Sequence, residues 1–302
     1  MVPRMLVARA SDFQNMNALD WVSCISTADG RTVAAEVACN YKTPVDGVSH
    51  GELAVAMGAD IIIQNFYDLH NPKIDGCPEK IFQSEAPLSE YKRLIGCPVG
   101  VNFLIGQKEH AEGLGGRNPT PENIELALNQ GADMFFLYAI RRFGCTLDLL
   151  YNTVREMLKV LGDKAPLFVN NQQILAVPRN DETINKFMES DKELLSLGCH
   201  GIILPMPCTK RGWMLEPTAK LIDGIKANNG LAWLIMGESI PGAPADTMHQ
   251  MALQAKMLGA DVCMIDYSGI YGMADLMNIF EFSLAYRGKT HTFFRMASSI
   301  LR

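Results

Sequence analysis

Three carboxylate side chains lie in or after short apolar runs, where the strands of an α/β protein present their functional groups. Glu36 lies inside one run, and Glu238 and Asp266 follow two others. Grouped carboxylates can bind a divalent cation such as Mg²⁺ or transfer protons to and from a substrate. We take these three as candidate catalytic residues. The alternative is that neighbouring amides bond each carboxylate, which then only positions a loop. Because the sequence does not bring the three together, a shared metal site is the weaker hypothesis.

Further polar side chains at the same run ends suit a polar ligand. Amide, hydroxyl and guanidinium groups form hydrogen bonds with phosphate and carboxylate oxygens. The candidate substrate-binding residues of this kind are Asn40, Gln64, Asn65, Asn102, Tyr138, Arg141 and Asn170. An asparagine inside a protein is as often structural, so each of these also has a purely structural interpretation.

Two glycine-rich segments, 237–244 and 266–272, follow the last two apolar runs. Small residues let backbone N–H groups approach a phosphate, so the pair predicts an anion site between the segments. The residues assigned to it are Gly237, Ser239, Ser268, Gly269 and Gly272. The alternative is that glycine only makes the turns. A third glycine-rich segment, 113–119, is a surface loop or a mobile lid.

A repeat indicates which elements position these residues. A glycine, a small residue and a polar residue precede an apolar run four times, and glycine suits the left-handed end of a helix. The polar residues are Asp60, Asp133, His200 and Asp261. The copies are spaced at about twice the length of one strand–helix unit, so one further strand is expected between each pair of copies, and an opening strand lies upstream of the first.

The sequence thus predicts eight short apolar strands, at 32–39, 61–63, 97–103, 134–137, 165–170, 201–204, 231–237 and 262–265. Helical patterns lie between them, at 122–129, 147–161, 182–197, 216–227 and 245–258. We predict a single (β/α)8 TIM barrel over 1–302, with an N-terminal helix in 1–30 capping the barrel and C-terminal helices in 273–302. The structural alternative is a doubly wound open sheet.

Strand alternation places Glu36 and Asn102 inside the barrel. Glu36 and Asp266 belong to the first and last strands, which are neighbours in a closed barrel, so we expect the two carboxylates to lie close together. The four polar residues of the repeat are expected at the opposite, N-terminal ends of the even strands. No lysine lies within a strand, so a Schiff base would need a loop lysine such as Lys210.

Composition excludes several classes of partner. The net charge of −6 argues against nucleic acid and anionic membranes, which attract clustered Lys and Arg. No apolar run approaches the ~20 residues of a membrane span. The eight cysteines include no CxxC pair, as is typical of reduced thiols. We expect a cytoplasmic protein that binds a small molecule and forms a homo-oligomer. The basic stretch 287–302 is expected to be a solvated helix face.

Three motifs resemble the BtpA-like family of phosphate-binding-type barrels. They are the Gly-Ala-Asp strand entry, the Pro-Val-Gly-Val-Asn strand at 98–102, and the strand at 60–65. The similarity is greatest from about residue 33 to about residue 139. It implies a ribulose-phosphate-type barrel, some of whose relatives carry labels such as phosphoenolpyruvate phosphonomutase or haloacid-dehalogenase-like hydrolase. The second label does not suit this chain, which has no Asp-x-Asp motif. No family catalytic residue is carried over.

Two functions remain at this stage. The first is an enzyme that acts on a small phosphorylated or carboxylated metabolite by lyase or isomerase chemistry at the C-terminal face of the barrel. The second is a non-catalytic metabolite-binding regulator or assembly factor that uses the same pocket. The three carboxylates favour the enzyme, and the absence of a complete catalytic motif keeps the alternative open.

Overall fold

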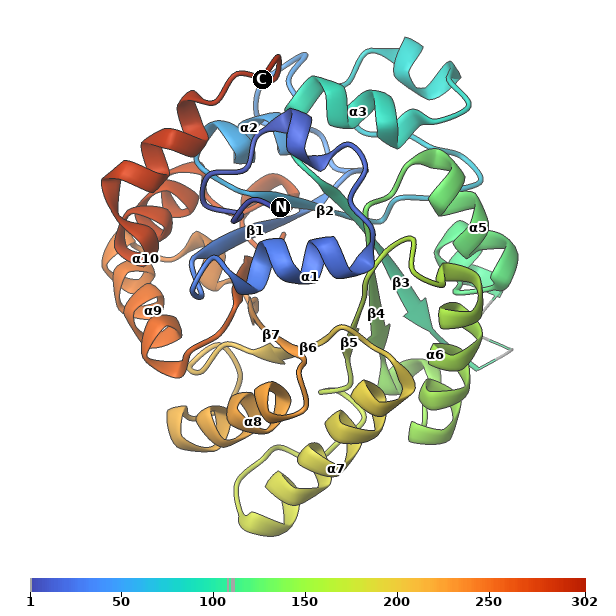
Figure 1. The fold of residues 1–302 in the computed structure, drawn as a ribbon, viewed down its shortest axis with the longest axis vertical. Coiled ribbons are helices and arrows are strands. Elements are labelled where there is room, and N and C mark those ends of the chain that lie inside the picture. The colour runs from blue at the N-terminus through green and yellow to red at the C-terminus, as the bar shows by residue number, and fades with distance from the viewer. Residues whose placement is uncertain (1, 108, 110–111) are drawn as a thin grey trace.

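Eight parallel strands close into a barrel in the computed structural model, which describes residues 2–107, 109 and 112–302 (Figure 1). Each strand pairs with its neighbours along the chain, and β8 pairs with β1. The strands are β1 Thr32–Ala38, β2 Ile61–Asn65, β3 Val99–Ile105, β4 Met134–Ala139, β5 Leu167–Asn170, β6 Gly201–Pro205, β7 Leu231–Met236 and β8 Val262–Ile265. The predicted TIM-barrel fold is confirmed.

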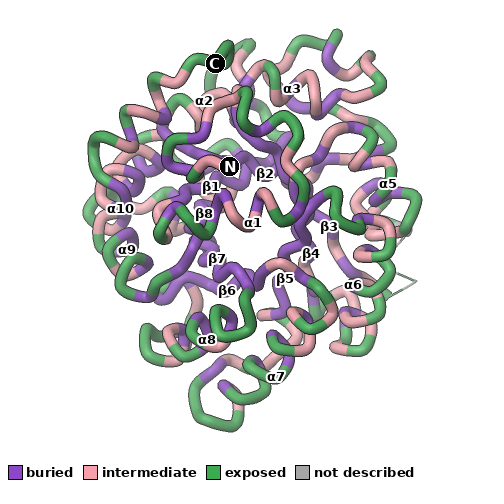
Figure 2. The backbone as a smooth tube through the Cα atoms, in the orientation of Figure 1, coloured by how far each residue is buried: buried purple, intermediate pink, exposed green. Residues whose placement is uncertain are grey.

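Helices surround the barrel, and the strands at its centre are buried (Figure 2). The helices are α1 Ala18–Ser26, α2 His50–Ala56, α3 Pro87–Ile95, α5 Pro121–Gln130, α6 Leu147–Leu161, α7 Asp181–Leu197, α8 Leu215–Ala227, α9 Ala245–Leu258 and α10 Leu276–Ala297. The predicted helix at 122–129 gains a residue at each end, because Thr120 caps its first turn and Gly131 ends it in the left-handed conformation.

The barrel interior is a packed core below its C-terminal mouth. The rings of Phe136, Phe168 and Trp233 contact one another, with centroids 4.6–5.3 Å apart. Alternation along each strand directs these side chains inward and their neighbours toward the helices. These aromatic rings fill the middle of the barrel below the cavity at the C-terminal ends of the strands.

The four-fold repeat has one structural role at the N-terminal ends of the even strands. Each polar residue donates its backbone N–H to a carbonyl at the start of the preceding odd strand, and its side chain accepts the N–H of that same residue. The pairs are Asp60 with Val33, Asp133 with Val99, His200 with Leu167 and Asp261 with Ala232, with bonds of 2.7–3.2 Å. The predicted placement of all four residues is confirmed.

The N-terminal segment covers the floor of the barrel. In Figure 1, α1 crosses the central opening. Met5, Trp21 and Ile25 pack against interior side chains from the first residues of the strands, including Ala34 and Val262. Within the expected range 1–30, the helix begins at residue 18, because Asn17 accepts a hydrogen bond from Asp20 and caps it.

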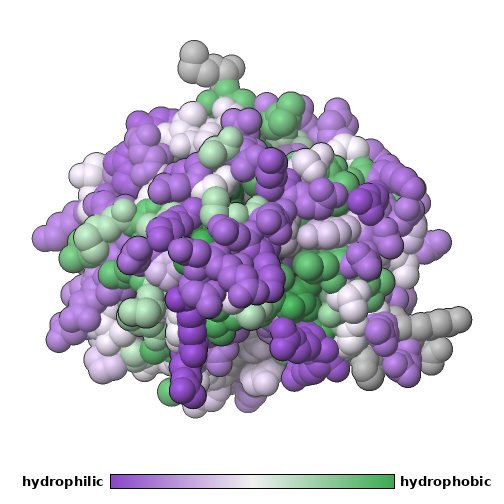
Figure 3. All heavy atoms as spheres, turned by 90° about the horizontal axis from the view of Figure 1, so that it is seen from below, coloured by the Kyte–Doolittle hydropathy of each residue, from purple (hydrophilic) through white to green (hydrophobic). Residues whose placement is uncertain are grey.

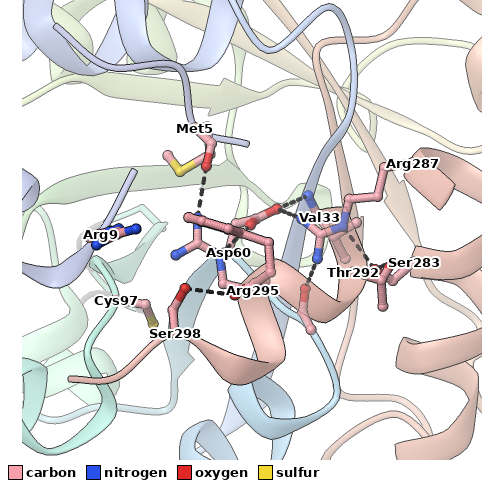
Figure 4. A network of polar contacts seen from close by, with 12 residues as sticks. Met5, Arg9, Val33, Asp60, Cys97, Ser283, Arg287, Thr292, Arg295 and Ser298 are labelled. Atoms are coloured by element: carbon pink, nitrogen blue, oxygen red, sulfur yellow. Dashed lines mark hydrogen bonds and ion pairs between the residues drawn. The ribbon is translucent and has the colours of Figure 1, made fainter. Parts of the chain in front are cut away.

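An ion cluster joins both ends of the chain to β2 (Figure 4). Arg287 and Arg295 of α10 both bind the carboxylate of Asp60, and all three side chains are at least 97% buried. Arg295 also donates to the carbonyl of Met5 at 2.7 Å. The expectation that this basic stretch forms a solvated helix face is therefore wrong for these two arginines. The arginines can be buried here because Asp60 neutralises part of their charge, and the carbonyls of Gly58 and Met5 and the Ser283 hydroxyl accept further N–H groups.

Hydrophilic side chains predominate on the face drawn in Figure 3, and the hydrophobic ones form interrupted areas between them. Within the described part of the chain, no helix has the length and apolar character needed to cross a membrane.

Candidate active site

A cavity of about 500 Å³ lies at the C-terminal mouth of the barrel. Side chains from every strand, or from the loop after it, line this cavity. They include Glu36 from β1, Asn65 from β2, Asn102 from β3, Tyr138 from β4, Gln172 after β5, Lys210 after β6, Glu238 after β7 and Asp266 after β8. The structure therefore brings together the three candidate carboxylates and three of the predicted polar side chains.

Glu36 is held rigidly at the base of the cavity. Its side chain is inward on β1, where the residue is only 2% exposed. Asn65 donates to its Oε1 at 2.9 Å, and Asn102 donates to the same oxygen. Because both amides donate to Oε1, this oxygen acts as an acceptor, and a bound proton is expected on Oε2.

Burial, followed by the charge of Asp266, raises the pKa of Glu36 to about 8, although its two amide donors lower it. Burial also raises the pKa of Asp266 to about 6, while hydrogen bonds from Ser268 lower it. Two interacting carboxyl groups titrate as a pair. Near neutral pH the pair therefore holds one proton, and the more buried Glu36 is the member that retains it.

Asp266 is positioned by the backbone around it. The N–H of Ser268 donates to its Oδ1 at 2.8 Å, and the Ser268 hydroxyl donates to the same oxygen. A β-carbon at Gly237 would overlap the Asp266 carboxylate. Gly237 at the end of β7 thus provides the space that Asp266 occupies. This steric role differs from the anion-binding role that the glycine pattern suggested.

Glu238 lies at the rim and its side chain is 56% exposed. Lys210 binds its Oε1 at 3.2 Å and donates to Gln172 at 3.1 Å. This ion pair joins the loops after β6 and β7. Glu238 is therefore engaged in an ion pair at the solvent-exposed rim, whereas Glu36 and Asp266 lie deeper in the cavity.

Arg117 is a cavity residue that strand-end reasoning did not select. Its guanidinium donates to Asn65 Oδ1 at 3.0 Å and lies 4.7 Å from the ring centre of Phe66. Burial lowers its pKa. No described carboxylate forms an ion pair with it. The only signal in the sequence was its place in the glycine-rich segment 113–119, after β3.

The cavity contains both acidic and basic side chains. Its carboxylates come from β1 and from the ends of β7 and β8, which are adjacent in the barrel. Its arginines, Arg117 and Arg142, come from the loops after β3 and β4, and Lys210 comes from the loop after β6. Arg117 is joined to Glu36 through Asn65, and Lys210 is paired with Glu238.

The two glycine-rich loops after β7 and β8 adjoin, as expected, but they bond each other. The N–H of Ser239 donates to the Ser268 hydroxyl at 3.0 Å, and the N–H of Gly242 donates to the Ser239 carbonyl at 3.2 Å. A β-carbon at Gly269 would overlap the Met273 carbonyl, so a bulky residue there disturbs the loop itself. The phosphate site between these loops stays a prediction, although several of its donors are already engaged.

The other predicted ligand residues lie around the cavity without lining it. Asn40 is exposed beyond β1. Gln64 is buried between the barrel and its helices, because alternation turns it away from the interior that Asn65 faces. Arg141 is exposed and donates to the Ile174 carbonyl. Asn170 is buried inside the barrel.

Backbone strain gathers at the mouth of the barrel. Several non-glycine residues in the loops after strands have positive φ angles of 58–71°, namely Phe66, Cys208, Glu238, Ser239 and Tyr271. Such conformations cost roughly 1–3 kcal/mol each and cluster at functional sites. Their concentration after β2, β6, β7 and β8 supports the assignment of this face as the working face.

The described residues include no group of three His, Cys, Asp or Glu side chains placed to hold a metal ion. Glu36 and Asp266 come with amides and arginines as neighbours, which is a donor set more suited to proton transfer than to a cage for Mg²⁺. The structure therefore favours the proton-transfer hypothesis for the carboxylates.

Comparisons with known proteins give a family and a fold. Residues 6–302 match the family model described as "Domain of unknown function (DUF7916)". No curated protein matches the chain. Among solved structures, it is similar to 2,3-dimethylmalate lyase, a PEP mutase/isocitrate lyase superfamily member (TM-score 0.50, 14% identity, 85% of this chain and 81% of that chain). It is also similar to the YdjI aldolase from Escherichia coli K12 (TM-score 0.50, 11% identity, covering 92% of this chain and 95% of that chain). At such identities the likeness shows the barrel fold alone.

Proposed function

The chain belongs to the DUF7916 family, and we propose that it is an enzyme that acts on a small phosphorylated or carboxylated metabolite by lyase or isomerase chemistry. One observation carries this proposal. Glu36 and Asp266 share one cavity, and both have a raised pKa because they are buried. Carboxyl groups whose environments separate their pKa values are suited to act as an acid and a base at neutral pH.

The two carboxyl groups would divide the chemistry. Asp266, ionised at neutral pH, accepts a proton from a carbon next to the anionic group of the substrate. The released electron pair forms a double bond as the bond from the neighbouring carbon to its oxygen breaks. Glu36 Oε2 gives its proton to that oxygen, which leaves as a hydroxyl compound or water. This elimination is a lyase reaction. Isomerisation requires a carbonyl at the neighbouring carbon and a hydroxyl on the first carbon. The electron pair then forms an enediol as Glu36 protonates the carbonyl oxygen. Return of the proton from Asp266 to the neighbouring carbon, with loss of the proton of the first carbon's hydroxyl to Glu36, gives the isomer.

Other expectations support the same proposal. The BtpA-like resemblance favours a phosphorylated ligand, and the arginines that line the cavity suit an anion of either kind. All eight cysteines are free thiols, as in the reducing cytoplasm, where we propose that the protein works. A homo-oligomeric state stays a prediction.

The experiment first screens sugar phosphates and small carboxylic acids for a compound that raises the melting temperature. That compound is then incubated with the enzyme in D2O, and ¹H NMR follows exchange of its C–H protons and its turnover. We expect exchange that is fastest between about pH 6 and 8, where Glu36 is protonated and Asp266 is ionised.

The variants Glu36→Gln and Asp266→Asn keep the shape of each group and remove its acid–base function. Each should reduce exchange by roughly 100-fold or more while the compound still binds. If the wild-type protein binds the compound but neither exchanges nor converts it, the non-catalytic binding function replaces the proposed one. Full activity in both variants would remove these two residues from the mechanism.

A further inference from the structure

Resting on the proposed function, we propose that the substrate is a phosphate monoester whose phosphate group binds between Arg117 and Arg142, at the loops after β3 and β4. Both side chains line the same cavity as Glu36 and Asp266, and Asn65 joins Arg117 to Glu36 because it forms a hydrogen bond with each of them. This location differs from the glycine-rich loops after β7 and β8, and it assigns the two arginines a ligand.

Arg117 is prepared to bind an anion. Asn65 accepts one of its N–H groups at 3.0 Å, and the ring of Phe66 supports its guanidinium at 4.7 Å. Phe66 itself has a positive φ of 62°, so the chain accepts local strain to place this ring. The charges of Glu36 and Asp68 partly offset the effect of burial on this guanidinium, but no described carboxylate forms an ion pair with it, so an anionic ligand would be its direct partner.

Arg142 adds the second positive charge. Its guanidinium lies 4.9 Å from the ring centre of Phe143, and no described carboxylate forms an ion pair with it. The loops after β3 and β4 are adjacent, because the two strands pair along their length. Two guanidinium groups match the charge of a phosphate monoester, about −1.5 to −2 at pH 7, better than that of a single carboxylate.

The opposite side of the mouth is a poorer site for phosphate. Backbone donors there are engaged by Ser268, Ser239 and Asp266. The carboxylates of Glu238 and Asp266 also lie there and would repel an anion. The ends of β7 and β8 therefore disfavour a phosphate, and the arginines on the loops after β3 and β4 favour one.

The test measures binding of inorganic phosphate and of acetate by calorimetry at low ionic strength. Its variants are Arg117→Gln, Arg142→Gln and, as a matched control, Arg141→Gln. Arg141 adjoins Arg142 in sequence but is exposed, does not line the cavity and donates to the Ile174 carbonyl. We expect phosphate affinity to fall about tenfold or more in each of the first two variants and less than twofold in the control. Arg142 is exposed, so its replacement tests the site even where Arg117→Gln fails to fold.

The remaining outcomes separate this inference from the proposed function. Phosphate that binds equally well to all three variants overturns the arginine site, while the acid–base proposal stands on its own exchange experiment. Acetate binding that depends on both arginines, with phosphate not preferred, overturns the phosphate assignment in favour of a carboxylate. If neither anion binds the wild-type protein, the inference is wrong, and the D2O experiment alone decides the proposed function.

Discussion

The two central carboxyl groups differ in what surrounds them. Glu36 lies at the base of the cavity with two amide donors on one oxygen, whereas Asp266 lies at its edge beside Ser268 and Gly237. The deeper group has the higher pKa, because burial disfavours its charged form most. Near neutral pH we therefore expect the proton of the pair on Oε2 of Glu36 and the negative charge on Asp266.

A single substitution can test whether the Asp266 carboxylate needs the space that Gly237 leaves for it. Gly237→Ala places a methyl group where the Asp266 carboxylate lies, so the carboxylate must move. We expect the turnover number to fall at least tenfold, because a misplacement of about 1 Å at a catalytic group has effects of this size or larger. Gly242→Ala, in the same loop and with only a 3.9 Å neighbour, is the control and should leave turnover unchanged. Equal turnover in the wild type and Gly237→Ala would show that Asp266 need not occupy this position.

Single residues were predictable from the sequence only where a strand fixes their direction. Alternation placed Glu36 and Asn102 inside the barrel, and the adjacency of β1 and β8 placed Asp266 beside Glu36. The same rule, applied without knowing the inward parity of β2, selected Gln64 together with Asn65, although only Asn65 faces the cavity. Arg117 and Arg142 lie on loops, whose path no periodic pattern specifies, so their convergence was visible only in the structure.

Among the elements, helix α10 supplies both arginines that bind Asp60, from the two sides of a break in the helix. A glycine with φ 79° and ψ 167° interrupts it at Gly288. Arg287 lies before this break and Arg295 lies after it, yet both bind the one carboxylate of Asp60. The break turns the second half of the helix so that the two guanidinium groups converge, and Arg295 then also holds the N-terminal segment through Met5.

This convergence predicts how the protein responds to two substitutions. Asp60→Asn removes the carboxylate and leaves two buried arginines, which should lower the free energy of unfolding by about 3–5 kcal/mol. Gly288→Ala has room for its methyl group, so its cost is the strained backbone alone, about 1–3 kcal/mol. Urea denaturation measures both. Because neither residue lines the cavity, the surviving folded protein should bind ligands as the wild type does. If the Asp60→Asn variant has the same free energy of unfolding as the wild type, the ion cluster around Asp60 does not stabilise the protein.

At the scale of the whole molecule, the barrel is built as four two-strand units. In each unit, one polar residue bonds both backbone groups at the start of the preceding strand. The sequence repeat predicted the number and order of the strands because this local requirement recurs in every unit. It could not predict what neutralises each polar residue, because those partners come from distant helices, such as Lys92 for Asp133 and Arg287 for Asp60.

His200 is the one member of the repeat that is not an aspartate, and this difference predicts a pH dependence of stability. Its Nδ1 accepts the N–H of Leu167 at 3.2 Å, which requires the neutral ring. Burial lowers the pKa of His200 in the folded protein. As the pH falls below about 6.5, the unfolded chain therefore binds a proton that the folded chain excludes, and the free energy of unfolding decreases.

His200→Asn keeps an acceptor for Leu167 and removes the titration. Urea denaturation at several pH values between 5 and 7.5 should show similar stabilities near pH 7.5 and a smaller loss in the variant on acidification. Other histidines contribute to the acid response, since burial also lowers the pKa of His50, so the difference between the two proteins isolates His200. Parallel pH profiles would mean that the folded protein protonates His200 as readily as the unfolded chain does, and that the bond from Leu167 does not depend on the neutral ring.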